Sequence, residues 1–537
     1  MKAIPSLDEL RKLSPGSLQK ISTDLKSFVL NATKEKAGHL ASSLGVAELT
    51  LTLHYLLNTP DDILLWDVGH QAYIHKVITD RASVFKFNRQ KNGPSGFPNR
   101  KESEFDSFGV GHSSTTLSAL IGFARADKIN NRNRKRVAVI GDGAFTAGMI
   151  YEALNDAGSK HDDILLIIND NGLAIEKNSG ALHDFSRYKE FCESLGWNFI
   201  GRDIKGNNTM ELVKKIKYAL SLSGPRVLHI ITQRPSLKDL GLKESPPSKK
   251  SFQIHFAKKL IELAKTENRL VALTAAMAPG CSLDLFRKKF PDRFFDVGIA
   301  EQHVLTQAAG MAAAGMRPVV NLYSTFSQRA VDQWIHDIAL QNLPVIMCLD
   351  RSGIVGEDGA THHGVFDLAL FRVVPNTEIW APRNNLELKN SIEEAFLKAI
   401  PAIIRYPKGD EPKLPEPIKR EGEVDIFRYG GNTIHWCLGP SISDALTHSK
   451  KSDGVIDLRK AKPIDYNTLK KFSKNSSHWV VWEDAQFIGG VGEALSSFIT
   501  ENNLNIKLTQ MGYPDNFIGH GKTDNLKIEN RREINQP

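Results

Sequence analysis

Cysteine is scarce in this sequence, and long apolar runs are absent. The four cysteines lie far apart and form no Cys-x-x-Cys pair, which excludes a disulfide scaffold and a thiolate zinc site and favours free thiols in a reducing compartment. The first 20 residues contain no apolar signal core, and no run approaches transmembrane length. We therefore expect a cytoplasmic protein without a membrane partner.

The sequence also lacks a basic stripe with interleaved aromatic residues. Its formal charge of +8 is spread over 537 residues. Nucleic-acid binding is therefore the weaker interpretation, and anionic small-molecule substrates fit the charge as well. The chain is too long for one core. Two polar, Pro-containing segments, 236–250 and 408–423, divide it into predicted domains 1–250, 251–412 and 413–537.

Helical and strand patterns alternate along the chain, which predicts the α/β class with doubly wound, mainly parallel sheets. Short apolar runs bounded by turn residues mark the strands. The predicted strands include 63–66, 137–140, 164–168, 227–231, 270–274, 319–322, 345–349, 402–404 and 479–482.

The segment 136–173 is the most informative part of the sequence. An apolar run is followed by GDGA (141–144), then by helical spacing and a second apolar run, which predicts strand, turn, helix and strand. If the strands are parallel neighbours, Asp142 and Asn171 lie at one edge of the sheet, where open α/β sheets bind ligands. With the main-chain oxygen of Leu173, they suit Mg²⁺ that takes its remaining oxygens from phosphates and water. Taken alone, Gly-Asp-Gly is more often a simple strand-ending turn.

Four histidine-bearing segments lie on predicted turns or helix starts. A single histidine in such a place is more often structural. Four of them at predicted strand ends favour a site, because loops at that rim carry function and histidine transfers protons near neutral pH. The segments are Gly38-His39, 67–71 (DVGHQ), 111–115 (GHSST) and 358–364 (DGATHHG).

The second domain carries an acid and several cations on predicted turns. Glu301 stands at a predicted helix start after a strand, where it is either a helix-dipole partner or, if buried, a group that holds a proton against a ring nitrogen. Arg351 directly follows an apolar strand, and arginine is shaped to bind phosphate, although surface cations are usually only solvated. Nearby turns contain YSTF (323–326), Gln328-Arg329 and RYPKG (405–409).

Five stretches, taken in order, resemble one known family. They are WDVGHQAYIHK, SEFDSFGVGHSST, GDGAFTAGMIYEALN, FDVGIAEQH and DRSGIVGEDGATHHGVFD. Over nearly its whole length the chain is similar to the 1-deoxy-D-xylulose-5-phosphate synthase family of transketolase-like thiamine diphosphate enzymes. The resemblance implies two thiamine-diphosphate-binding folds, a diphosphate/Mg-binding domain (1–250) and a pyrimidine-binding domain (251–412), followed by a transketolase C-terminal-like domain (413–537).

The same resemblance implies an activity. The enzyme would be a transferase that condenses pyruvate with D-glyceraldehyde 3-phosphate, with loss of CO₂, to 1-deoxy-D-xylulose 5-phosphate for isoprenoid, thiamine and pyridoxal biosynthesis. Its implied cofactors are thiamine diphosphate and Mg²⁺, and its implied assembly is a homodimer. Thiamine diphosphate itself carries the difficult chemistry, and the protein binds and orients it.

Roles for individual residues also follow from the resemblance. Mg²⁺ would be held by Asp142, Asn171 and the Leu173 carbonyl. The cofactor would contact His70, Gly111, His112, Ser113, Gly143, Ala144, Asn171, Glu301 and Phe326. Of these, Glu301 would bond the pyrimidine and Phe326 would stack on it. The catalytic residues would be Glu301, His39, His70, His362 and Asp358. The substrates would contact His39, Tyr323, Arg329, Arg351 and Lys408.

The chain departs from the family pattern in two motifs. Where the family has KGxGY, residues 232–237 are TQRPSL, which keep a cation, Arg234, but not the glycines or the tyrosine. The second cation of RYPRG is Lys408, which lacks the two-pronged geometry of arginine. The chain is also shorter than typical members, chiefly between about 179 and 295. Two alternatives stay open: a transketolase-like paralogue with a different donor or acceptor, and a catalytically degenerate homologue that acts as a binding partner.

Overall fold

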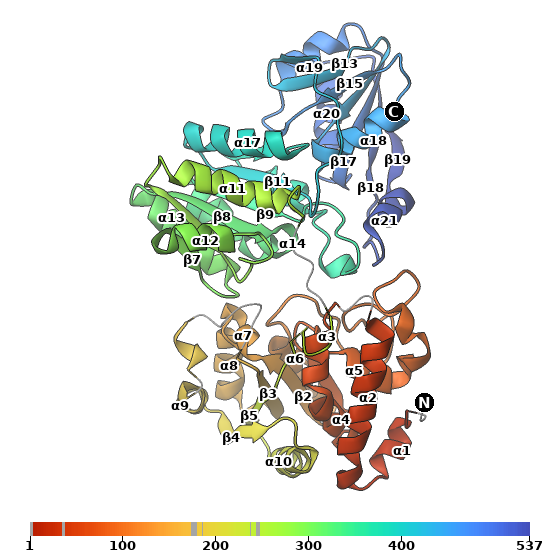
Figure 1. Cartoon of the computed structure of the whole chain (residues 1–537), viewed down its shortest axis with the longest axis vertical. Coiled ribbons are helices and arrows are strands. Elements are labelled where there is room, and N and C mark those ends of the chain that lie inside the picture. Colours follow the sequence, from red (N-terminus) through yellow and green to blue (C-terminus); the bar gives the residue numbers. More distant parts are fainter. Residues whose placement is uncertain are drawn as a thin grey trace. The chain divides into compact units, whose positions relative to one another are not determined.

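The computed structural model describes residues 4–34, 38–172, 180–184, 186–236, 238–242 and 248–536. The chain forms two compact units, Met1–Ser245 and Pro246–Pro537, coloured red to yellow-green and green to blue in Figure 1. Helices and strands alternate in both units, and most neighbouring strands are parallel. The predicted α/β class is therefore confirmed. Among the described residues, no helix combines the length and the apolar character needed to cross a membrane.

The first unit is built on a five-stranded parallel sheet in the order β1-β2-β3-β5-β4. The strands are β1 (Ile63–Trp66), β2 (Arg136–Gly141), β3 (Ile164–Asp170), β4 (Asn198–Lys205) and β5 (Pro225–Ile231). Strand β4 was not predicted. It lies at the edge of the sheet and buries only Phe199 and Ile204, so its sequence lacks the apolar run of a central strand.

Helices cover both faces of this sheet. Alternate residues of β2 enter different cores: Ala138 and Ile140 pack with α6 and α8, whereas Val137 and Val139 pack with α4 and α10. This is the doubly wound arrangement that the sequence predicted. The helices are α1 (Leu7–Arg11), α2 (Leu18–Thr33), α3 (Leu40–Gly45), α4 (Ala47–Leu56), α5 (Tyr73–Lys76), α6 (Thr116–Ile129), α7 (Asp142–Phe145), α8 (Gly148–Lys160), α9 (Ser186–Ser194) and α10 (Thr209–Ser221).

The second unit contains two seven-stranded sheets. The first has the order β16-β10-β11-β9-β8-β6-β7 and is parallel except at β16. Its strands are β6 (Leu270–Thr274), β7 (Phe294–Asp296), β8 (Arg317–Tyr323), β9 (Ile346–Asp350), β10 (Glu378–Trp380), β11 (Ala402–Tyr406) and β16 (Lys460–Lys462). Its helices are α11 (Phe252–Ala264), α12 (Asp284–Lys289), α13 (Glu301–Ala313), α14 (Ser324–Ser327), α15 (Val331–Gln333), α16 (Asp367–Phe371) and α17 (Asn385–Lys398).

The second sheet of this unit has the order β12-β13-β15-β14-β17-β18-β19. Four central strands are parallel, and the edge strands are antiparallel. The strands are β12 (Lys419–Glu421), β13 (Val424–Arg428), β14 (Thr433–Cys437), β15 (Gly454–Asp457), β17 (His478–Gln486), β18 (Lys507–Tyr513) and β19 (Arg532–Gln536). The helices are α18 (Ile442–His448), α19 (Tyr466–Ser473), α20 (Val491–Glu501) and α21 (Thr523–Asn530).

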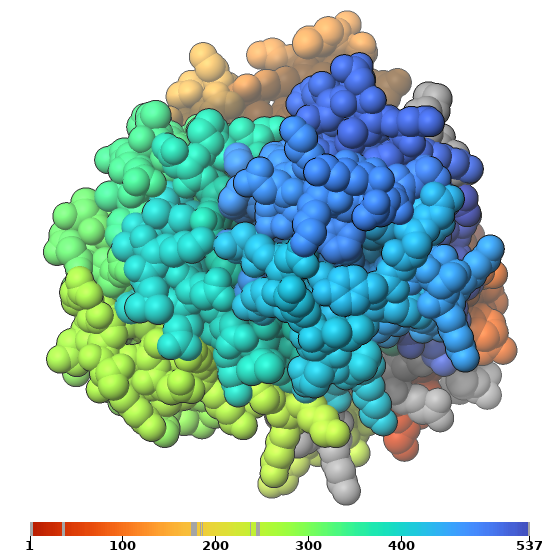
Figure 2. All heavy atoms as spheres, turned by 90° about the horizontal axis from the view of Figure 1, so that it is seen from above, coloured from red at the N-terminus to blue at the C-terminus, as the bar shows by residue number. Residues whose placement is uncertain are grey.

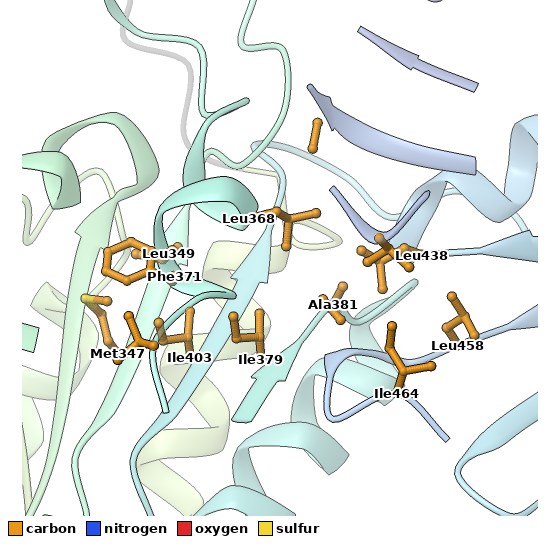
Figure 3. Close-up of a cluster of buried hydrophobic side chains, with 14 of the residues drawn as sticks. Met347, Leu349, Leu368, Phe371, Ile379, Ala381, Ile403, Leu438, Leu458 and Ile464 are labelled. Atoms are coloured by element: carbon orange, nitrogen blue, oxygen red, sulfur yellow. The ribbon is translucent and has the colours of Figure 1, made fainter. Parts of the chain in front are cut away.

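The two sheets of the second unit are joined by the path of the chain and by a common core. Strand β16 comes from the segment after residue 413 but belongs to the first sheet, where it pairs with β10. In Figure 3, Ala381 lies between Ile379 of the first sheet and Ile464, with Leu458 beyond, and all four belong to one cluster of buried side chains. In Figure 2 the teal and blue atoms of this unit form an uninterrupted surface. This shared core explains why segments 251–412 and 413–537 form one compact unit.

Candidate functional site

In the first unit, one buried carboxylate connects the loops that follow β1 and β2. Asp67 Oδ1 accepts a hydrogen bond from the Ser114 amide at 2.7 Å, and Oδ2 accepts one from Thr116 Oγ1 at 2.7 Å. Ser114 Oγ in turn donates to the Ala144 carbonyl at 3.0 Å. The DVGH, GHSS and GDGA segments are thereby held together at the carboxyl edge of the sheet, where the sequence placed the candidate residues.

The predicted site residues His39 and His70 lie next to each other, with ring centroids 6.2 Å apart. Gly69, with φ +82°, precedes His70, and a Cβ there would lie 2.4 Å from Pro98 Cδ, so only glycine fits at this turn. Ser43 Oγ donates to the His70 carbonyl at 3.1 Å. Burial, with a smaller effect of His39, lowers the pKa of His70 to about 3. His70 is therefore neutral at physiological pH.

Strands β2 and β3 are parallel neighbours in which Gly141 is opposite Asn169. Asp142 begins α7 and is 1% exposed. The ends of these strands therefore place Asp142 and Asn171 at the same edge of the sheet, as predicted. Leu173, the third predicted Mg²⁺ ligand, lies outside the described residues.

The first two residues of the segment Asn169-Asp170-Asn171 have structural partners. Asn169 Nδ2 donates to Gln71 Oε1 at 3.0 Å and Asn169 Oδ1 accepts from Thr232 Oγ1 at 2.6 Å. Asp170 Oδ2 lies 2.8 Å from His229 Nε2 inside the sheet. Asn171 lines a cavity. Asn169 and Asp170 are thus held in the protein interior, and Asn171 lies at the edge of the sheet.

The cavity at Asn171 has a volume of about 750 Å³. Arg234, the cation that remains where the family has KGxGY, lines the same cavity. The sequence departure therefore leaves a positive side chain beside Asn171. The other lining residues are Lys26, Ser27, Leu30, Leu44, Gly45, Glu48, Asn207, Thr232, Gln233, Pro235, Asp239 and Leu240.

In the second unit, Glu301 is the first residue of α13 and is 4% exposed. Arg329 NH1 lies 3.8 Å from Glu301 Oε2. Burial raises the pKa of Glu301, and the Arg329 charge opposes that rise. The carboxyl group therefore retains a proton more readily than an exposed glutamate does.

Four predicted residues of the second unit form a row. The Arg351 guanidinium lies 3.7 Å from the centroid of the Tyr323 ring. The Tyr323 ring stacks on Phe326 at 5.5 Å, and Phe326 meets His362 edge-on at 5.5 Å. Asp358 precedes the single turn Gly359–Thr361, which is followed directly by His362. A cation, two aromatic rings and a histidine are thus contiguous.

Gln253 joins the strand ends that carry the two cations. Its Nε2 donates to Asp350 Oδ1 at 2.5 Å and to the Pro407 carbonyl at 3.1 Å. Arg351 NH1 donates to the other oxygen of Asp350 at 2.6 Å. Lys408 follows Pro407 and is exposed. The buried Asp350 and Gln253 therefore connect the backbone of Lys408 with Arg351.

Three of these supporting residues were not identified from the sequence: Asp67, Gln253 and Asp367, whose contacts are described below. Asp67 and Asp367 belong to the quoted motifs but were assigned no role, and Gln253 lies in an ordinary helical pattern. No cluster of three or more His, Cys, Asp or Glu side chains suited to a metal occurs within the described ranges.

Comparison with known proteins identifies the family. The chain is 40% identical to the 1-deoxy-D-xylulose-5-phosphate synthase of Histophilus somni, over 98% of this chain and 96% of that protein. The protein of the same name from Pseudomonas aeruginosa is 37% identical over 98% and 95%. The chain belongs to the 1-deoxy-D-xylulose-5-phosphate synthase family.

Family profiles agree with this relationship along the chain. The profile for 1-deoxy-D-xylulose-5-phosphate synthase matches residues 1–190, that for the transketolase pyrimidine binding domain 249–413, and that for the transketolase C-terminal domain 431–530. The alignment with the Histophilus synthase extends over 596 positions, more than the 537 residues of this chain. The relative therefore contains segments without a counterpart in this family member.

Two solved transketolases resemble this family member in structure. A split-gene transketolase described as an inactive beta4 tetramer has a TM-score of 0.45 and 27% identity over 49% of this chain and 90% of that chain. The transketolase of Campylobacter jejuni has a TM-score of 0.45 and 16% identity over 96% and 98%. TM-scores below 0.5 are too low to support a structural argument.

Proposed function

We propose that this chain condenses pyruvate with D-glyceraldehyde 3-phosphate, with loss of CO₂, to give 1-deoxy-D-xylulose 5-phosphate. The observation that carries the proposal is membership of the synthase family over nearly the full length of the chain. The buried Glu301, with its raised pKa, supports it. The same relationship favours this activity over a transketolase-like change of donor or acceptor.

The first unit is proposed to bind the diphosphate of thiamine diphosphate through Mg²⁺. Asp142 and Asn171 provide one carboxylate and one amide oxygen, which suit a hard cation that completes its coordination with phosphate and water. The carbonyl of Leu173 is proposed as the third protein ligand. The proposed cofactor contacts on the neighbouring loops are His70, Gly111, His112, Ser113, Gly143 and Ala144.

The second unit is proposed to bind the aminopyrimidine. A protonated Glu301 would donate a hydrogen bond to a ring nitrogen, and its raised pKa favours that form. Phe326 would stack on the ring. When bound, thiamine diphosphate supplies the electron sink that decarboxylation of a 2-oxo acid requires.

Substrate recognition is proposed for the remaining predicted residues. Tyr323, Arg351 and Lys408 would bind the acceptor phosphate, which suits the Arg351–Tyr323 stack and the exposed Lys408. Arg329, whose NH1 lies 3.8 Å from Glu301 Oε2, would line the same substrate pocket. The proposed contacts to substrate oxygens and protons are His39, His70, Asp358 and His362, of which His70 is neutral because of its lowered pKa.

We further propose a homodimeric, cytoplasmic enzyme with no nucleic acid or membrane partner. The proposed domains are 1–250 for the diphosphate, 251–412 for the pyrimidine and 413–537 as the transketolase C-terminal-like domain. The family profiles at 249–413 and 431–530 support the last two.

The decisive test is an assay of the purified chain with thiamine diphosphate and Mg²⁺. Pyruvate and D-glyceraldehyde 3-phosphate should release CO₂ and form a pentulose phosphate in equal amounts. Use of a ketose phosphate donor instead of pyruvate would identify a transketolase-like paralogue. No turnover, together with an unchanged melting temperature in millimolar cofactor, would indicate a binding partner and refute the proposal.

A further inference from the structure

We propose that Asp367 is a positioning residue that sets the spacing of the groups that bind the acceptor phosphate. This inference rests on the proposed function, because Tyr323, Arg351 and Lys408 are phosphate ligands only within it. Asp367 itself is 3% exposed and is assigned no contact with a substrate.

One oxygen of Asp367 has three side-chain partners. Oδ2 accepts hydrogen bonds from Ser352 Oγ at 2.8 Å, Arg405 Nε at 3.0 Å and Ser324 Oγ at 3.2 Å. Oδ1 accepts a hydrogen bond from the Leu368 amide at 2.8 Å, within α16. The three donors come from three different segments of the second unit.

Each donor is close in sequence to one proposed phosphate ligand. Ser324 directly follows Tyr323 at the end of β8, and Ser352 directly follows Arg351 at the end of β9. Arg405 is in β11, three residues before Lys408. A single buried carboxylate therefore connects the three strand ends that carry the phosphate-binding side chains.

The backbone around Asp367 leaves little freedom for this arrangement. Gly353 and Gly364 exchange two backbone hydrogen bonds of 2.8 Å. A Cβ on Gly364 would lie 2.5 Å from the Arg351 carbonyl oxygen and 2.6 Å from Ser324 Cβ. The segment that leads to Asp367 is thus packed directly against two of the strand ends that its carboxylate connects.

The charge of Asp367 is needed as well as its shape. Arg405 is 4% exposed, and its NH2 also donates to the Asp484 carbonyl at 3.1 Å. Its guanidinium is therefore held inside the protein, unlike the exposed Lys408 side chain. Removing the carboxylate charge would leave the buried Arg405 cation without its ion-pair partner. An unpaired buried charge is strongly destabilising, so the side chain would rearrange. That rearrangement would move β11 and the loop that carries Lys408.

The main variant is Asp367→Asn, which preserves size and one acceptor oxygen. We expect the KM for D-glyceraldehyde 3-phosphate to rise about tenfold, as for one charge-assisted contact. The KM for pyruvate and the kcat should change less than about twofold. The KM for unphosphorylated D-glyceraldehyde should also be unchanged. An equal rise for both acceptors, or no rise for the phosphorylated one, would overturn the proposal.

Asp425→Asn is the matched control. Asp425 is 1% exposed and binds Arg383 at 2.6 Å and Arg420 at 2.7 Å, so it is a similar buried ion pair on the second sheet. The control should lower the melting temperature but leave the KM for both acceptors unchanged. If it raised the KM for the phosphorylated acceptor as much as Asp367→Asn did, general destabilisation would explain the effect, and the positioning role would be refuted.

A second variant covers the case in which Asp367→Asn does not fold. Ser352→Ala removes one partner of the carboxylate without leaving a buried charge, and we expect a rise of about threefold in the KM for the phosphorylated acceptor. An unchanged KM would contradict the proposal.

Calorimetric titration with inorganic phosphate distinguishes failure of the positioning role from failure of the proposed function, because it requires no turnover. Weaker phosphate binding by the variants supports the positioning role even if the wild type does not condense the two substrates. Equal binding in wild type and variants refutes it even in an active enzyme.

Discussion

The carboxylate of Asp67 and the amide of Ser114 lie 2.7 Å apart, although the residues are 47 positions apart in sequence. This contact joins the loop after β1 to the segment that begins α6. Ser114 extends the connection to Ala144. The loops proposed to bind the diphosphate are thus held by a carboxylate that is itself 0% exposed.

Asp67→Asn should therefore weaken cofactor binding. The variant loses the charge that accepts two backbone amides and a hydroxyl. Loss of one charge-assisted hydrogen bond costs about 1.5–3 kcal/mol, so the Kd for thiamine diphosphate should rise by about ten- to a hundredfold. Fluorescence titration measures this Kd. Asp127→Asn is the control, because Asp127 binds Arg134 and Arg136 at the opposite end of β2. Equal effects of the two variants would remove Asp67 from the site.

Glu301→Ala should abolish turnover and largely retain the cofactor. If Glu301 holds a proton against the pyrimidine, its loss should lower kcat by about 10²–10⁴, as for other proton-transfer groups. Steady-state kinetics and a cofactor titration separate the two effects. Asp284→Ala is the control, because Asp284 also begins a helix, where an acidic side chain interacts favourably with the helix dipole, and it is not among the proposed site residues. Unchanged turnover in Glu301→Ala would show that Glu301 is a dipole partner as well.

Lys408→Arg should strengthen acceptor binding. Arginine restores the two-pronged geometry that lysine lacks at phosphate, so the KM for D-glyceraldehyde 3-phosphate should fall by about two- to fivefold. Lys408→Ala should raise it by about tenfold. The exposed Lys413→Arg, outside the predicted site, should have no effect. A fall in KM with Lys413→Arg, or none with Lys408→Arg, would contradict a phosphate role.

The second unit should lose stability as the pH rises towards neutrality. Burial raises the pKa of Glu483 from 4.5 to about 7, although the carboxylate accepts amide hydrogen bonds from Val491 and Gly492. The folded state therefore keeps a proton that the unfolded state releases. This stabilisation is fully present below about pH 4.5 and is lost as the pH rises through about 7. Its size is on the order of 3 kcal/mol.

Glu483→Gln imitates the protonated form and should remove this dependence. The melting temperatures of wild type and variant should agree at pH 4.5, and the variant should be the more stable at pH 8. Glu493→Gln, an exposed change in α20, the helix whose first amides donate to Glu483, should follow the wild type. Parallel curves for wild type and Glu483→Gln would show that Glu483 does not titrate in this range.

Much of the fold was predictable because buried parallel strands require continuous apolar runs. Predicted strands such as 270–274 agree with β6 (Leu270–Thr274). A short edge strand shows the limit of this approach. Strand β16 (Lys460–Lys462) is short and polar, and only its pairing with β10 shows that it belongs to the neighbouring sheet. No local pattern contains that information.

The sequence by itself determined the α/β class, the family and the residues that carry recognisable chemistry, such as Asp142, Glu301 and Arg351. Only a few chemical roles explain these side-chain types at these turn positions. Only the tertiary structure decided which buried groups position the residues of the proposed site. Asp67, Gln253 and Asp367 act through partners tens of residues away, and only folding brings such partners within hydrogen-bond distance.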